Sequence, residues 1–132
     1  MAQARDSAIV ATLVLLCVQL VCTIVNAETY MVGGDKGWTS DVFTWPNGKS
    51  FKAGDVLVFM YDRTKNDVAV VDQHGYETCT VTDLGDERYQ TGYDEIKLKG
   101  GKTFFISSFP GNCESGTKIA INASPTISPA AI

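Results

Sequence analysis

The residues best placed for chemistry lie in a loop between two expected strands. Residues 104–106 (F-F-I) close an apolar run that is typical of a buried strand, and residues 116–122 alternate as a closing strand does. The loop between them, residues 107–115, carries Cys113 at a place where β-sandwiches often hold a metal or a ligand. It contains no histidine, no methionine and no second cysteine. What the loop lacks is therefore as informative as what it carries.

The first 27 residues have the pattern of a secretory signal peptide. Arg5 supplies a positive start, residues 9–25 are largely apolar, and residues 25–27 (V-N-A) fit a small-residue cleavage signal. We therefore expect a mature chain that begins at Glu28. The alternative is an uncleaved signal anchor that stays in the membrane.

Cleavage would leave one pair of cysteines, Cys79 and Cys113, because Cys17 and Cys22 depart with the signal. In an oxidising compartment a disulfide is the default for such a pair. Two free thiols acting as metal ligands are the weaker alternative, since two cysteines with His74 make no known ligand spacing.

The charge and the missing motifs argue against several classes of function. The 132-residue chain has a net charge of −4, and the signal removes one arginine and one aspartate, so the mature part keeps that charge. A mildly acidic chain with no basic stripe or stacking platform is unlike a nucleic-acid-binding protein. There is no G-x-S-x-G sequence, and the single histidine has no sequence-supported serine or cysteine partner. We therefore expect no enzyme.

Short strand-like segments separated by turn signals predict the elements that would position the loop. The strongest is residues 56–61 (V-L-V-F-M-Y), rich in β-branched and aromatic residues. Residues 84–92 are polar and irregular, with room for one short helical turn. About eight short strands without a helical period predict an all-β Greek-key sandwich. Its further strands are expected at residues 29–32, 68–71, 76–82, 93–98, 103–107 and 116–122.

Gly37-Trp38 and three longer strings that follow it in the chain carry a family resemblance. The three strings are W-P-N-G-K-x-F-x-A-G-D-V-L-V-F-x-Y from Trp45, N-x-V-x-V-V-x-x-x-x-Y-x-x-C from Asn66, and F-F-I-x-x-F-P-G-x-C-x-x-G-x-K-I from Phe104. Together they closely resemble the phytocyanins, plant extracellular cupredoxins, over residues 29–123. The resemblance implies a cupredoxin-like sandwich and a disulfide that joins Cys79 to Cys113.

Copper-binding phytocyanins hold a type 1 copper with two histidines, a cysteine and an axial methionine or glutamine. The matching positions in this chain hold Asn66 and Asn112 for the histidines, Ser107 for the cysteine and Thr117 for the axial ligand. The resemblance therefore implies the early nodulin-like group, whose members lack the copper ligands, and it implies that copper is absent. The competing hypothesis is a type 1 blue-copper electron carrier, which the overall resemblance suggests.

These four residues are poor copper ligands. A blue copper site needs a thiolate, whereas a serine or threonine hydroxyl stays protonated and an asparagine oxygen suits calcium better. Two interpretations follow: a plug in which the four residues hydrogen-bond one another or the loop backbone, or a recognition pocket for a sugar or peptide. We favour the plug. His74, in an expected turn, is interpreted as a structural residue and not as a replacement ligand.

The end of the chain bears on location and modification. Residues 122–124 (N-A-S) make Asn122 an N-glycosylation acceptor in a secreted chain, with Pro125 directly after them. The phytocyanin domain is expected to span residues 28–123, before a disordered Ser/Pro/Ala-rich tail at residues 124–132.

No hydrophobic tail of the roughly 10–20 residues needed for a GPI signal follows the domain. We expect a secreted, monomeric protein of the extracellular space or cell wall. A longer chain with such a tail would lie on the outer plasma-membrane surface. The expected partner is an extracellular protein or a cell-wall glycan.

Overall fold

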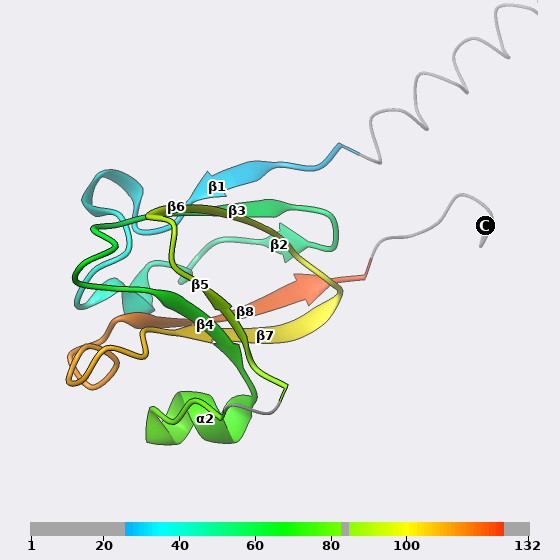
Figure 1. The fold of residues 1–132 in the computed structure, drawn as a ribbon. Coiled ribbons are helices and arrows are strands. Elements are labelled where there is room, and N and C mark those ends of the chain that lie inside the picture. The colour runs from blue at the N-terminus through cyan, green and yellow to red at the C-terminus, as the bar shows by residue number, and fades with distance from the viewer. Residues whose placement is uncertain (1–25, 83–84, 126–132) are drawn as a thin grey trace, which may run out of the picture. The chain divides into compact units, whose positions relative to one another are not determined.

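The computed structural model describes residues 26–82 and 85–125, and these residues form two β-sheets packed face to face (Figure 1). Most of the expected signal segment (residues 1–25) and most of the expected tail (residues 126–132) lie outside the described residues. None of the helices in the described part is long and apolar enough to cross a membrane.

The described part contains a three-stranded and a five-stranded sheet. The smaller sheet has the order β1 (Thr29–Met31), β3 (Val56–Met60) and β6 (Tyr93–Lys97). The larger sheet has the order β2 (Phe51–Lys52), β8 (Lys118–Ser124), β7 (Gly101–Ile106), β4 (Val68–Val71) and β5 (Glu87–Tyr89). The β1–β3 and β2–β8 pairs are parallel, and the other pairs are antiparallel. The expected all-β sandwich of about eight strands is confirmed.

An aromatic series joins the two sheets through the core. The ring of Phe59 on β3 lies 5.0 Å from the indole of Trp38 on one side and 5.0 Å from the ring of Phe105 on the other (ring centroids). All three side chains are buried. Burying a large apolar side chain contributes about 1.5–3 kcal/mol, so this series is a main source of the attraction between the sheets.

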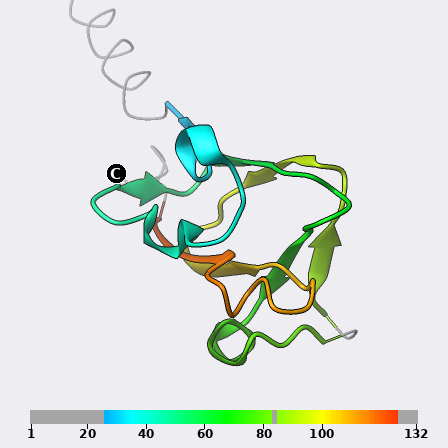
Figure 2. The same cartoon turned by 90° about the vertical axis from the view of Figure 1, so that its left-hand side faces the viewer.

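The loops that carry the candidate site gather at one end of the sandwich. Figure 1 shows the β3–β4 and β7–β8 connections at the end opposite the start of β1 and the end of β8, and Figure 2 turns this end toward the viewer. Two short 3₁₀ turns, Gly34–Lys36 and Val42–Thr44, belong to the β1–β2 connection. Residues 66, 107, 112 and 117 are therefore held by loops of the same end.

The expected strand at residues 76–82 is wrong. Residues Gln73–Thr78 form a short helix, α2, and Cys79 follows it with a left-handed backbone (φ 54°). The side chain of Asp72 caps the helix by accepting a hydrogen bond from the backbone nitrogen of Gly75 at 2.7 Å. His74 consequently lies exposed on a helix and not in a turn. Residues 76–82 alternate as a strand does, but the capping hydrogen bond of Asp72 starts a helix at Gln73.

Two further boundaries differ from the expectation. The segment expected to be irregular contains β5 (Glu87–Tyr89), an edge strand that pairs with β4 and keeps mostly exposed polar residues. The expected tail begins too early, because β8 continues through Ser124. Ala123 is buried, and the carbonyl of Ser124 accepts a hydrogen bond from the nitrogen of Ala53 at 2.7 Å. Backbone pairing with β2 and the alternating burial of residues 118–124 therefore carry the last strand through Ser124.

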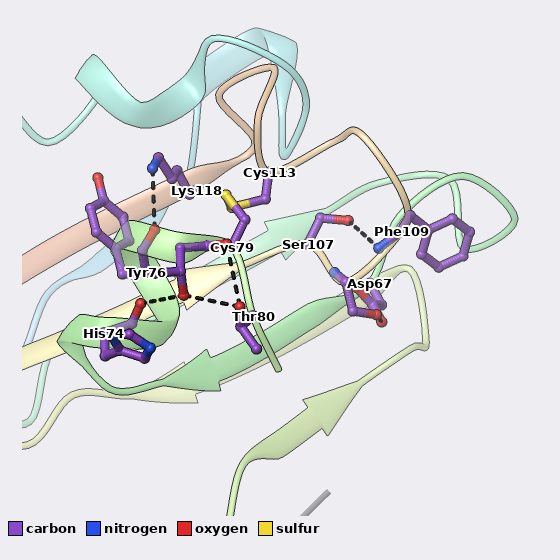
Figure 3. Close-up of a disulfide and its surroundings, with 11 residues drawn as sticks. Asp67, His74, Tyr76, Cys79, Thr80, Ser107, Phe109, Cys113 and Lys118 are labelled. Atoms are coloured by element: carbon purple, nitrogen blue, oxygen red, sulfur yellow. Dashed lines mark hydrogen bonds between the residues drawn. A yellow bond between two sulfur atoms is a disulfide. The ribbon is translucent and has the colours of Figure 1, made fainter. Parts of the chain in front are cut away.

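The expected disulfide between Cys79 and Cys113 is present, with an S–S distance of 1.98 Å. It ties the end of α2 to the β7–β8 loop, as Figure 3 shows. Cys113 is buried in a small second core with Ala69, Val71 and Ile106. The disulfide therefore anchors the loop against the outer face of the larger sheet.

Removing the disulfide should lower the free energy of unfolding by about 3–4 kcal/mol, because the bond closes a loop with a sequence separation of 34 residues. The test is urea unfolding of the C79A/C113A variant beside the native protein, with a double exchange to serine as a check on packing. Unfolding free energies that agree within 1 kcal/mol or so would contradict this prediction.

Candidate functional site

A tight turn positions the first two residues of the site. The carboxylate of Asp62 accepts hydrogen bonds from the nitrogen and the hydroxyl of Thr64 at 2.9 and 2.6 Å. These bonds keep the pKa of Asp62 below its usual value, and the bond from the hydroxyl has the larger effect. The carbonyl of Asp62 also accepts from the nitrogen of Asn66 at 3.0 Å. The turn therefore delivers Asn66 and Asp67 directly before β4.

Asn66 and Asn112 meet across the two loops, although 46 residues separate them in sequence. The Nδ2 of Asn112 donates to the Oδ1 of Asn66 at 2.7 Å and to the carbonyl of Lys65 at 2.7 Å. Both protons of this amide are thereby used. Within the described part of the chain, the Nδ2 of Asn66 and the Oδ1 of Asn112 have no hydrogen-bonding partner.

Ser107 and Thr117 lie deeper, at the two ends of the β7–β8 loop. Both are buried, and the nitrogen of Ser107 donates to the carbonyl of Thr117 at 3.0 Å. The hydroxyl of Ser107 accepts a long hydrogen bond of 3.4 Å from the nitrogen of Phe109, drawn in Figure 3. The nitrogen of Thr117 donates to the carbonyl of Asn112 at 3.0 Å. The four positions are thus brought to one end and joined mainly through the loop backbone.

Asp67 and Ser108 are the residues that the sequence interpretation missed. The Asp67 side chain is buried and accepts hydrogen bonds from the nitrogen of Ser108 at 2.7 Å and from the hydroxyl of Ser108. The carbonyl of Asp67 accepts from the indole nitrogen of Trp38 at 2.8 Å. The available signal was that Asp67 directly precedes the apolar segment V-A-V-V. A carboxylate buried beside such a segment requires hydrogen-bond donors such as those of Ser108.

A shallow, open depression of about 390 Å³ lies over the two asparagines. It is lined by Thr39, Ser40, Lys65, Asn66, Phe109, Pro110, Asn112 and Thr117, and Lys65 is the one charged residue among these described lining residues. Ser107 lies below the lining and does not contribute to it. The surface therefore offers amide and hydroxyl groups beside one aromatic ring.

The other residues considered from the sequence lie elsewhere. Asn122 is exposed on β8, opposite Lys102 in the strand register, and His74 is exposed on α2. In the part of the chain that the structure describes, no three or more histidine, cysteine, aspartate or glutamate side chains form a group suited to a metal ion. The four site positions supply only neutral oxygen and nitrogen groups, a donor set that does not fit copper.

Comparison with known proteins places these features in a family. The model of the plastocyanin-like domain matches residues 36–117. The basic blue protein of Cucumis sativus is 50% identical over 94 residues, which cover 71% of this chain and 97% of that protein. Early nodulin-like protein 22 of Arabidopsis thaliana is 40% identical over 121 residues, covering 87% of this chain and 86% of that protein.

The fold agrees with a solved structure of the same kind. The structure described as cucumber basic protein, a blue copper protein, superimposes with a TM-score of 0.70 at 49% sequence identity, covering 72% of this chain and 98% of that one. Sequence, disulfide and sandwich therefore lead to one conclusion: this chain belongs to the phytocyanin family, whose members carry the plastocyanin-like domain.

Proposed function

We propose that this chain is a secreted, copper-free phytocyanin of the early nodulin-like kind, which acts as an extracellular binding protein and not as an enzyme. The observation that carries the proposal is the chemistry of the four site positions. Asn66, Ser107, Asn112 and Thr117 provide no thiolate, imidazole or thioether, and two of them already bond to each other. A blue site requires the thiolate in particular.

The hydrogen bonds supply the mechanical role that a metal would have in this family. A metal joins the loops that carry its ligands, and here the Asn112–Asn66 and Ser108–Asp67 hydrogen bonds join the same two loops. Asp67 is buried, and a buried polar group without a partner costs about 1–3 kcal/mol, so the bonds from Ser108 in particular hold the loops together. This supports the plug interpretation, in which the site residues hydrogen-bond one another or the loop backbone.

The upper part of the site suits a neutral partner rich in hydroxyl groups. The Nδ2 of Asn66 is a donor and the Oδ1 of Asn112 an acceptor, and both residues line the depression. A hydroxyl group both donates and accepts, so it complements such a pair. The aromatic face of Phe109 beside them matches the apolar face of a sugar ring. We therefore favour a neutral cell-wall glycan over a protein partner.

Electron transfer is the alternative function, and the similarity to the basic blue protein of Cucumis sativus favours it. The two functions differ in what they require of Ser107. An electron carrier of the blue-copper type needs a thiolate at its centre. A binding protein needs only the shape and the hydrogen-bonding groups of this end.

The copper-free proposal predicts a colour difference. The native protein supplied with copper should stay colourless, whereas the variant N66H/S107C/N112H/T117M should turn blue, because it regains imidazole, thiolate and thioether on an intact sandwich. Visible absorption spectra of both proteins provide the measurement, with circular dichroism to establish that the variant is folded. An intense blue native protein would restore the electron-transfer function.

The glycan proposal predicts a loss of binding on exchange of one donor. Asn66→Asp keeps the acceptor for Asn112 but removes the free amide donor, so affinity should fall about tenfold, the effect of one lost hydrogen bond. The probes are neutral xyloglucan and arabinogalactan fractions, measured by calorimetry.

Asn47→Asp is the matched control, because it makes the same chemical change at an exposed asparagine outside the depression and outside the glycosylation sequence. Equal affinity of the two variants would contradict binding at the depression. Binding to cell-wall proteins without binding to either glycan would favour the other class of partner.

A further inference from the structure

A second buried carboxylate lies at the opposite end of the sandwich, where β1 begins. The side chain of Asp55 is completely buried in the β2–β3 connection. Its Oδ2 accepts a hydrogen bond from the nitrogen of Lys52 at 2.9 Å. Its Oδ1 accepts from the backbone nitrogen of Glu28 at 2.9 Å and lies 3.2 Å from the Nζ of Lys52. One of the three groups around this carboxylate is therefore the backbone nitrogen of the residue expected to begin the mature chain.

Contacts downstream of the cleavage point hold Glu28 in place. Its carbonyl accepts a hydrogen bond from the nitrogen of Val56 at 2.8 Å, and Thr29 pairs with Val56 in the parallel β1–β3 ladder. The carboxylate of Glu28 accepts from the hydroxyl of Tyr30 at 2.8 Å. None of these contacts uses residue 27 or any earlier residue, so removing those residues leaves the Glu28 nitrogen beside Asp55.

We propose that proteolytic processing between Ala27 and Glu28 creates an α-ammonium group that pairs with the buried carboxylate of Asp55 and locks β1 to the sandwich. This inference rests on the secretion that forms part of the proposed function. Hydrolysis of the peptide bond by a signal peptidase consumes one water molecule and leaves a carboxylate on Ala27 and an amine on Glu28. The amine takes a proton from the solvent, so a neutral N–H donor becomes a charged one.

The local charges favour this conversion. Before cleavage the cluster contains the carboxylates of Glu28 and Asp55 and the ammonium of Lys52, which leaves one uncompensated negative charge. The new ammonium brings the sum to zero. The hydrogen bond to Glu28, followed by burial, raises the pKa of Tyr30 to about 12, so its hydroxyl stays neutral. On the neighbouring β6, Lys97 faces Val56 in register and Lys99 follows the strand, both exposed.

The proposal fixes the pH range of the effect. The pKa of Asp55 is raised by burial, but the hydrogen bonds from Glu28 and Lys52 and the Lys52 charge outweigh this and place it below its usual value. Its contribution to stability is therefore present above about pH 3.9 and is lost as pH falls through the lower folded value. Pairing raises the pKa of the α-amino group above its unfolded value of about 7.7–8.0. The stability that the ammonium group contributes is therefore complete below this range and disappears as pH rises through the pKa of the folded state.

The test compares three chains that differ only at the start: one beginning at Glu28 with a free amine, the same chain acetylated, and one that retains Ala27. At pH 6 the free-amine chain should melt about 4–8 °C higher than the other two, the effect of one neutral hydrogen bond becoming charge-assisted in a domain of this size. The difference should decrease above pH 9 and should disappear in the Asp55→Asn background. Equal melting temperatures of the three native chains would overturn the proposal.

A second measurement serves if Asp55→Asn does not fold. A protonated, paired amine reacts slowly with acylating reagents, so the chain beginning at Glu28 should be acylated several times more slowly at pH 8 than the chain beginning at Ala27. Equal rates would contradict the pairing. Mass spectrometry of the protein secreted from plant cells identifies its first residue, and a first residue other than Glu28 would overturn the processing step. None of these measurements involves copper or glycan, so they fail or succeed independently of the binding proposal.

Discussion

The hydrogen bonds of the Asp67 carboxylate are the constraint on which the site end depends. Two segments far apart in sequence converge on this residue directly before β4: the Trp38 indole donates to its carbonyl, and Ser108 donates twice to its side chain. A carboxylate in a buried position is costly unless such donors satisfy it. The position of the β7–β8 loop is therefore coupled to the aromatic core through Trp38.

The loop is held on two sides by neighbouring residues. Asn112 is tied to the β3–β4 turn by its amide, and Cys113 is tied to the end of α2 by the disulfide. These ties act in different ways, because a disulfide mainly restricts the unfolded chain whereas a hydrogen bond between the loops stabilises only the folded one. Together they account for an ordered β7–β8 loop without assigning any role to a metal.

Much of the fold could be predicted because its strongest elements are also its most distinctive sequences. The segment V-L-V-F-M-Y became β3, F-F-I lies within β7, and the two remaining cysteines form the disulfide. Helix α2 could not be recognised, since its stability comes from the Asp72 cap and from packing near the disulfide and not from a helical period. Strand β5 was missed because an exposed edge strand needs no apolar alternation.

The candidate site could likewise be predicted only in part. The family motifs indicated that residues 66, 107, 112 and 117 belong to one end, but not which atoms would bond. Asp67 and Ser108 carry no motif of their own, and their importance appears only when loops 41 residues apart are placed together. The same holds for Asp55 and Glu28, which are 27 residues apart. Partners of buried charges depend on tertiary contacts, and local sequence does not specify these.

The central claim is that side-chain hydrogen bonds, and not a metal, close this end of the sandwich. The most direct measurement is the melting temperature of the native protein in a chelator and in excess copper(II), because a ligand that binds the folded state raises this temperature by mass action. His74→Ala serves as the control for weak binding at the exposed histidine. The account predicts the same melting temperature in both solutions. A rise that increases with copper concentration and persists in His74→Ala would contradict it.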